Sequence, residues 1–282
     1  MTNGRLPDFI IGGAQKAGST WLAEMLGHHP QLFVPPRELH FFDRDDYFAR
    51  GEQWYRQFFT EAAEQQLCGE KTPDYLLAEK ADGSRMPAAA RIREMLPEVK
   101  LLFVLRDPVT RAISALRHHL WFRRFPVSAG PDEILFGRHA AEAERWAILS
   151  NGLYSRQLRH YYDLFPSEHI RVWIFEDDVK GDPLALVQDA AAFIGVSADA
   201  ARIDPDRVSN RGVTSTVALR GNYYLPFLAP GWQVLDRLLK RKFVVSQDCL
   251  DRLTDYYRKD ADELARMLGR PLDKWSGRSK TA

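Results

Sequence analysis

Short apolar runs alternate with helical stretches along most of the chain. The run Leu101–Leu105 is apolar without alternation, as expected of a strand that is covered on both faces. Strands are predicted at 9–11, 67–70, 101–105 and 170–175, and helices at 20–26, 152–163, 183–194 and 249–268. Another helix is predicted to start near Pro108, because proline is favoured in the first helical turn. This order predicts a three-layer α/β fold with a central parallel sheet and helices on both faces.

Three stretches lack this pattern and are rich in proline and glycine: 122–134, 208–224 and 226–232. We expect variable loops near 122–134 and 208–232, where a lid or a substrate-shaping segment is typical. A length of 282 residues without an internal repeat predicts one domain over 1–282.

Composition narrows the classes of partner. Lys and Arg number 39 and Asp and Glu 38, a net charge of +1, whereas a protein that binds nucleic acid by its overall field is far more basic. We therefore expect no nucleic-acid partner, and a local site for any anionic ligand. The N-terminus has no signal-like apolar segment, and no apolar run is long enough to cross a bilayer. These features predict a soluble, cytoplasmic protein without a membrane span.

The two cysteines, Cys68 and Cys249, form no Cys-x-x-Cys pair, so the sequence supports neither a zinc site nor a redox motif. Two reduced thiols are the preferred interpretation, and a single disulfide between them stays open.

The most informative stretch is the glycine-rich turn from Gly13 to Thr20 between a predicted strand and a predicted helix. Its glycines have the spacing of a Walker A loop, but the lysine, Lys16, precedes Gly18 instead of following it. Backbone N–H groups at a helix N-terminus still converge on an anion, and Ser19 and Thr20 add hydroxyl donors. The alternative is an ordinary strand–helix turn with an incidental lysine.

A second stretch carries a cation at the end of a strand. Arg106 follows the run 101–105, and Ser114 lies two helical turns further on. Ligands of open α/β sheets bind at the carboxyl ends of strands, so a guanidinium and a hydroxyl here suit a second phosphate group. The alternative for Arg106 is an ion pair with Asp107 or with a neighbouring helix end.

Together these stretches resemble the sulfotransferases that use 3′-phosphoadenosine 5′-phosphosulfate (PAPS). Residues 15–22 resemble the 5′-phosphosulfate loop of that family, and residues 105–114 resemble its 3′-phosphate site. Residues 36–43, 69–75, 152–154 and 172–177 are similar to the heparan-sulfate and related carbohydrate branch. The resemblance extends over most of residues 7–215 and implies a P-loop-like fold. Members of that branch are usually membrane-anchored and many carry a disulfide in a late loop. We expect neither feature here, because no N-terminal apolar run is long enough and Cys68 and Cys249 are badly placed for such a disulfide. Both departures argue against heparan sulfate as the acceptor.

The resemblance implies a role for each residue of the site. Lys16 would stabilise charge on the leaving oxygen, and Arg106 and Ser114 would bind the 3′-phosphate, as a developing anion requires. Tyr154 would lie near the nucleotide or else in the core. The phosphosulfate loop would bind through Ala17, Gly18, Ser19, Thr20 and Trp21, and a late loop with Asn210, Arg211 and Gly212 would close over the nucleotide.

Glu38 is the implied general base, and its alternative is a surface carboxylate paired with Arg37 or Arg44. His40 is the rival base. Lys71 would keep Glu38 ionised, and its alternative is an ion pair with Glu70 or Asp74.

The implied function is in-line transfer of the sulfuryl group of PAPS to a hydroxyl of a carbohydrate, lipid or small metabolite, with 3′-phosphoadenosine 5′-phosphate (PAP) as product. We expect no metal, because no Walker B aspartate is evident. A P-loop kinase or other phosphotransferase is the alternative, but it requires a lysine directly after Gly18, where Ser19 stands. A nucleotide-binding protein without catalysis is a third hypothesis. The sequence predicts no oligomeric state.

Overall fold

The computed structural model describes residues 4–200, 213, 215–239 and 243–275. The chain divides into two compact units. The first comprises Met1–Asp107 and Tyr154–Ser209, and the second comprises Pro108–Leu153 and Asn210–Ala282. One domain over 1–282 stays a prediction.

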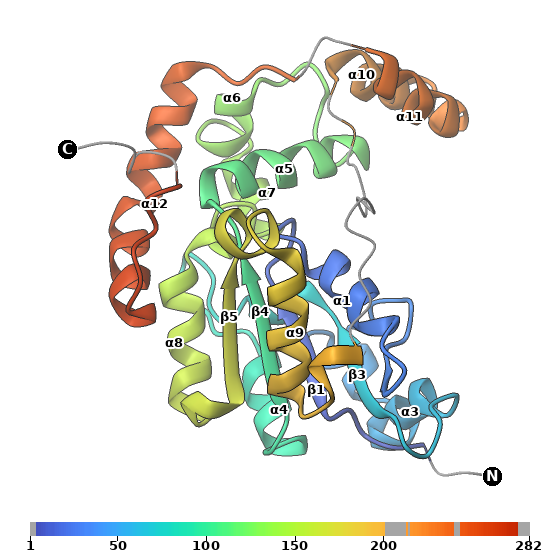
Figure 1. Cartoon of the computed structure of the whole chain (residues 1–282). Coiled ribbons are helices and arrows are strands. Elements are labelled where there is room, and N and C mark those ends of the chain that lie inside the picture. The colour runs from blue at the N-terminus through green and yellow to red at the C-terminus, as the bar shows by residue number, and fades with distance from the viewer. Residues whose placement is uncertain (1–3, 201–212, 214, 240–242, 276–282) are drawn as a thin grey trace. The chain divides into compact units, whose positions relative to one another are not determined.

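The first unit is built on a five-stranded parallel sheet with the strand order β2-β3-β1-β4-β5 (Figure 1). Its strands are β1 (Phe9–Gly13), β2 (Leu32–Phe33), β3 (Leu67–Lys71), β4 (Lys100–Leu105) and β5 (Ile170–Ile174). Four of them confirm the strands predicted from the apolar runs, whereas β2 is too short to leave a pattern.

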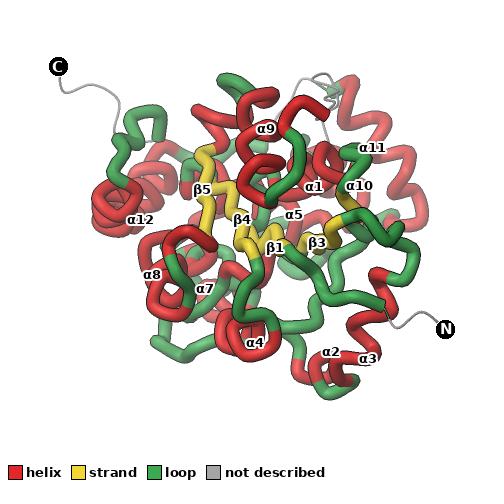
Figure 2. Tube along the Cα trace, turned by 60° about the horizontal axis from the view of Figure 1, so that its bottom comes forward, coloured by secondary structure: helices red, strands yellow, loops and turns green. Residues whose placement is uncertain are grey.

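Helices cover both faces of this sheet, as Figure 2 shows. They are α1 (Ser19–Gly27) and α9 (Pro183–Ile194) on one face, and α4 (Ala88–Met95) and α8 (Tyr154–Leu164) on the other. Because successive side chains of a strand point to opposite faces, Leu102 and Val104 pack with the α1–α9 core, while Phe103 meets the ring of Tyr161 edge-on at 5.0 Å between centroids. The predicted three-layer α/β fold is confirmed.

Shorter elements complete the first unit. They are the helices α2 (Asp45–Phe48) and α3 (Gly51–Arg56), 3₁₀ turns at Gln57–Phe59, Pro73–Leu76, Ser167–His169 and Ala198–Ala200, and a π-helical turn at Phe175–Val179.

The described part of the second unit is helical. Its helices are α5 (Pro108–Trp121), α6 (Pro131–Leu135), α7 (Ala140–Arg145), α10 (Thr216–Tyr224), α11 (Ala229–Leu238) and α12 (Gln247–Leu268), with 3₁₀ turns at Ser150–Gly152 and Pro226–Leu228. Tyr257 of α12 is buried, and its hydroxyl donates to the carbonyl of Leu149 at 2.9 Å. Leu116 of α5 and Leu253 of α12 belong to the same apolar core.

The loop predicted near 122–134 is confirmed over 122–130, which form neither helix nor strand, whereas the loop predicted near 208–232 is corrected. Helix α6 begins inside 122–134, and α10 and α11 occupy most of 208–232, of which 208–212 and 214 lie outside the described residues. Prolines that suggested loops stand in first turns, where the missing N–H costs no hydrogen bond, as Pro131 does in α6 and Pro230 in α11. Ser215 caps α10 by accepting from the N–H of Ala218.

Cys68 and Cys249 are buried free thiols. Among the residues that the structure describes, no helix combines the length and the apolar character that crossing a bilayer requires.

Candidate active site

The ends of four parallel strands bring the predicted residues of the first unit to one edge of its sheet. Ile11 of β1 is in register with Lys71 of β3 on one side and with Leu102 of β4 on the other. The turn after β1, the last residue of β3, Arg106 after β4 and Phe175 after β5 therefore share the carboxyl edge, where open α/β sheets bind ligands.

The turn between β1 and α1 is held in a defined shape. The N–H of Ala14 donates to the carbonyl of Val104 at 2.7 Å, and the N–H of Ala17 donates back to the carbonyl of Ala14 at 3.2 Å. Lys16 occupies the left-handed region at a φ of 65°. Helix α1 starts at Ser19, and the first N–H groups of a helix have no acceptor within it, so they can bind an anion.

Two further members of the predicted loop lie in α1. Thr20 is half-buried near the helix start, and Trp21 packs against the apolar core that α1 shares with the sheet. In the structure Trp21 therefore contributes to packing, and its contact with a nucleotide stays a prediction.

Gly18 is required by the geometry of this turn. Its φ is 108°, outside the range that other residues adopt readily, and a Cβ at this position would lie 3.0 Å from Cδ2 of Phe175. The Phe175 ring therefore packs directly against the turn at Gly18.

Arg106 lies beside the same turn. Its Nη1 donates to the carbonyl of Lys16 at 3.3 Å, and its guanidinium carbon lies 5.0 Å from the centroid of the Phe175 ring. A carboxylate neighbour of Arg106 is Glu176, whose Oε1 lies 3.9 Å from Nε. The buried Tyr154 donates its hydroxyl to the carbonyl of Arg106 at 2.9 Å, so it supports the backbone at this point.

The other predicted nucleotide contacts are not brought into this group. Ser114 lies on α5 in the second unit and is half-buried. Asn210, Arg211 and Gly212 lie outside the described residues. Their roles stay predictions.

Lys71 connects the turn to the predicted base. Its Nζ lies 2.6 Å from Oε1 of Glu38 and donates to the hydroxyl of Thr20 at 3.4 Å. This ion pair replaces the alternative pairings of Glu38 with Arg37 or Arg44. Residues 33 positions apart in the sequence thus meet next to the anion-binding turn.

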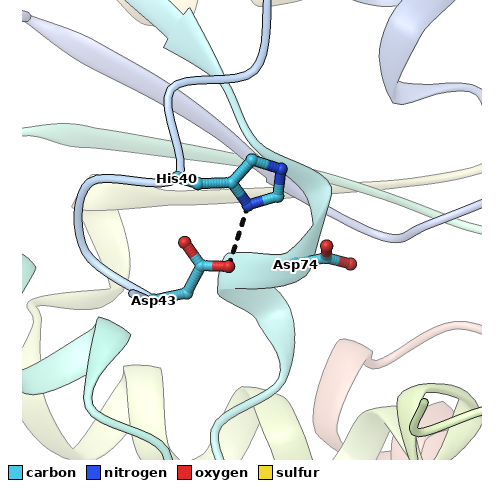
Figure 3. Close-up of side chains that lie close together, drawn as sticks. All are labelled: His40, Asp43 and Asp74. Carbon is cyan, nitrogen blue, oxygen red and sulfur yellow. Dashed lines mark hydrogen bonds and ion pairs between the residues drawn. The ribbon is translucent and has the colours of Figure 1, made fainter. Parts of the chain in front are cut away.

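Three carboxylates surround His40. Its Nε2 lies 3.4 Å from Oε2 of Glu38, and its Nδ1 lies 2.9 Å from Oδ2 of Asp43, the contact drawn in Figure 3. Asp74 completes a group in which one ligand atom each of His40, Asp43 and Asp74 lies within 4.8 Å of the others. Asp74 also accepts from the side chain of Gln15 at 3.2 Å.

The charges in this cluster shift the pKa values of His40 and Glu38 in opposite directions. Burial alone would lower the pKa of His40, but hydrogen bonds to Asp43 and Glu38 raise it to about 10. At neutral pH His40 is therefore an imidazolium, which has no nitrogen left to accept a proton. Asp43 and Asp74 place two further carboxylates around this ring.

Glu38 is held as a carboxylate by the same neighbours, and its role as base stays a prediction. Burial would raise its pKa, but hydrogen bonds and charges from His40 and Lys71 outweigh burial and lower the pKa to about 2. The carboxylate is ionised at neutral pH, as a base must be. Because so low a pKa makes it a weak base in the resting site, its contribution depends on its position and its hydrogen bond to an acceptor hydroxyl.

A buried carboxylate that the sequence did not single out fixes the loop of Glu38. Thr72 Oγ1 donates to Glu70 at 2.9 Å and accepts the N–H groups of Leu39 and His40. Tyr75 donates its hydroxyl to Glu70 at 3.1 Å and accepts the N–H groups of Phe41 and Phe42. Burial raises the pKa of Glu70 to about 7, although these hydroxyls oppose the rise.

Comparison with known proteins decides the family. The family model described as "Sulfotransferase family" matches residues 7–200, which is more than half of the chain. The chain belongs to the sulfotransferase family. The match covers the anion-binding turn, Lys71 at the end of β3 and Arg106 directly after β4.

Curated relatives of this sulfotransferase belong to the heparan-sulfate branch. Heparan sulfate glucosamine 3-O-sulfotransferase 5 of Mus musculus is 29% identical over 226 residues, 79% of this chain and 60% of the relative. Heparan sulfate glucosamine 3-O-sulfotransferase 3B1 of Homo sapiens is 34% identical over 193 residues, 68% of this chain and 45% of the relative. The chain thus spans about half the length of these relatives.

The fold agrees with a solved structure over almost the whole sulfotransferase chain. A sulfotransferase from Alicyclobacillus acidocaldarius superposes with a TM-score of 0.70 at 26% identity, covering 96% of this chain and 99% of that one.

Proposed function

We propose that this sulfotransferase moves the sulfuryl group of PAPS to a hydroxyl of a carbohydrate. The observation that carries the proposal is the position of Lys71, whose ammonium contacts both Glu38 and Thr20. It places an ionised carboxylate beside the anion-binding turn, so a donor and an acceptor hydroxyl can meet there.

The residues of the first unit fit a donor with two phosphate groups. The N–H groups at the start of α1 and the Thr20 hydroxyl suit the 5′-phosphosulfate. Arg106 lies against the turn and suits the 3′-phosphate, because a guanidinium binds phosphate through paired donors. Lys16, in the bend of the turn, suits the oxygen that bridges sulfur and phosphorus.

Glu38 accepts a hydrogen bond from the acceptor hydroxyl and takes its proton as that oxygen attacks sulfur. The bond between sulfur and the 5′-phosphate oxygen breaks on the opposite side, and its electron pair stays on the phosphate. Lys16 and Lys71 stabilise the charge that develops there, which is how fixed cations lower a barrier. His40 remains an imidazolium that orients Glu38.

The acceptor class follows the named activity of the relatives, which sulfate a glucosamine of heparan sulfate. We propose a hydroxyl of a glucosamine-containing glycan, and a lipid or a small metabolite is the competing acceptor.

The test is turnover with PAPS and EDTA against turnover with ATP and Mg²⁺, each with de-O-sulfated heparan sulfate, a glycolipid and a phenol as acceptors. We expect sulfated heparan sulfate as product, and only in the reaction that contains PAPS and EDTA. Turnover only with ATP and Mg²⁺ would establish a phosphotransferase instead. PAP binding measured by calorimetry without any turnover would establish a nucleotide-binding protein without catalysis.

A further inference from the structure

Three arginines of the first unit lie over aromatic rings, in a segment that begins at the proposed base. The guanidinium carbon of Arg37, the residue before that base, lies 4.5 Å from the centroid of the Phe58 ring. Arg44 lies 5.2 Å from the centroid of the Tyr47 ring, and Arg50 lies 5.3 Å from the same centroid. The arginine strip consists of Arg37, Arg44, Arg50, Tyr47, Trp54 and Phe58.

Ring contacts join these side chains into one continuous surface. The centroid of the Trp54 ring lies 4.8 Å from that of Phe58 and 5.4 Å from that of Tyr47. Arg50 also lies over the Trp54 ring, at 5.0 Å. Arg44 stands directly before α2 and Arg50 directly before α3, and these two helices are neighbours (Figure 2). The arginines therefore line one path instead of three separate points.

The strip is supported by the same aromatic core as the loop of the base. Tyr55 and Phe59 are buried, and Phe41 stacks on Tyr55 with 4.3 Å between ring centroids. The Phe41 ring also lies 6.0 Å from that of Trp54. A guanidinium over an aromatic face is attracted to the ring electrons, which holds its plane in place. Arginines held in this way lose less side-chain entropy when they bind a ligand.

The positive charges of the strip are not balanced by carboxylates. Its three arginines are exposed, and among the described residues no carboxylate forms an ion pair with any of them. The carboxylates of α2 and α3 have other partners: Asp45 pairs with Arg91, and Glu52 pairs with Arg56. Asp46 is a further exposed carboxylate of α2. The strip thus carries an excess of positive charge next to the candidate active site.

We propose that the arginine strip binds the anionic groups of an extended glycan acceptor whose hydroxyl lies at Glu38, an inference that rests on the proposed function. Carboxylates and sulfates accept paired hydrogen bonds from a guanidinium. A path of three arginines suits a chain that carries several negative groups. A neutral glycolipid or a phenol would leave these charges without a partner. The strip therefore selects the acceptor by its charge and takes no part in the chemical step.

Steady-state transfer from PAPS by the full chain tests this proposal with two acceptors of equal length. One is de-O-sulfated heparan sulfate, and the other is the same glycan with its carboxylates reduced and its N-sulfates replaced by acetyl groups. We expect a KM at least about tenfold lower for the anionic glycan, with a difference that shrinks at high salt. Arg44→Gln combined with Arg50→Gln should raise that KM about tenfold, with kcat and PAP affinity retained.

Two further variants show that the effect belongs to the charges of the strip. Arg93→Gln is the matched control, because the Arg93 guanidinium also lies over a ring, 5.6 Å from the centroid of Phe165. Helix α4 ends just before β4 begins, so Arg93 lies near the amino edge of the sheet, opposite the candidate site. We expect the wild-type KM for this variant. Arg44→Lys combined with Arg50→Lys keeps both charges and should recover most of the affinity for the anionic glycan.

The outcomes separate the strip from the proposed function. Equal KM values of the wild type for the two glycans would overturn the role of the strip, as would a wild-type KM in the double glutamine variant. Single-stranded DNA that competes as strongly as the anionic glycan would also overturn it, since the strip would then bind any polyanion. Calorimetry with PAP present measures glycan binding without turnover. Weaker glycan binding by the double glutamine variant of a protein that transfers no sulfate would support the strip and refute the proposed function.

Discussion

Replacing Gly18 by alanine tests whether the turn between β1 and α1 needs its observed shape. At a φ of 108° an alanine pays a backbone cost of about 1–2 kcal/mol, as other residues do in the left-handed region. The new Cβ would lie 3.0 Å from Cδ2 of Phe175, so the ring must shift, and overpacking of this kind costs about 1–3 kcal/mol. The bound state should therefore lose about 2–5 kcal/mol.

Two measurements together detect this loss of free energy: the stability of the free protein and its affinity for PAP. If the turn keeps its shape, the variant unfolds at lower denaturant concentration; if the turn relaxes, PAP binding weakens in calorimetry instead. The two losses should add to about 2–5 kcal/mol, because the bound state needs the strained turn in either case. A sum below about 0.5 kcal/mol, which is the range of ordinary surface substitutions, would refute the reasoning.

Gly27→Ala is the matched control. Gly27 ends the same helix, and nothing lies within 4 Å of a Cβ built there. Alanine should leave PAP binding unchanged and stability equal or slightly higher, since it restricts the unfolded chain. Adding Phe175→Leu to Gly18→Ala should recover the steric part of the loss but not the backbone part, and a double-mutant cycle measures that part separately.

Three further predictions concern the charged groups of the site. Glu38→Gln should lower turnover by about 10²–10⁴-fold with PAP affinity retained, whereas the control Glu52→Gln should be neutral; unchanged turnover would remove Glu38 as the base. Arg106→Ala should weaken PAP binding by about 2 kcal/mol in calorimetry, and an unchanged affinity would exclude Arg106 from the nucleotide site. Because the pKa of His40 is raised from 6.5 to about 10, the stability it contributes is complete below pH 6.5 and disappears as pH rises through 10. The difference in unfolding free energy between wild type and His40→Gln should shrink over that interval, and a constant difference would contradict the assigned charge.

Local features of the sequence were enough to predict the sheet and the anion-binding turn. The run Leu101–Leu105 is buried on both faces, and such strands show themselves as uninterrupted apolar stretches. Arg106 could be placed at the carboxyl edge because a strand ends before it and Pro108 starts a helix after it. Gly18 and Lys16 are recognisable because a turn of this shape depends on a few neighbouring residues.

Features that depend on distant parts of the chain could not be predicted. The pairing of Lys71 with Glu38 was expected only from the family resemblance, because it depends on the segment after β2 meeting the end of β3, which no local pattern encodes. The protonated state of His40 depends on carboxylates from two segments, one with Asp43 and the other with Asp74. Helix α11 was missed because proline and glycine disfavour helices in general but are accepted in a first turn.

The hydroxyls of Thr72 and Tyr75 accept four consecutive backbone N–H groups of the segment that follows Glu38. The segment therefore loses its conformational entropy when the chain folds. Substrate binding does not have to order it, so this loss does not weaken the affinity for substrate. A segment held in this way keeps the Glu38 carboxylate in one position and does not change its conformation for each acceptor. Discrimination among candidate acceptors then has to reside in neighbouring side chains, so exchanging those neighbours offers a route to altered selectivity that leaves the chemical step intact.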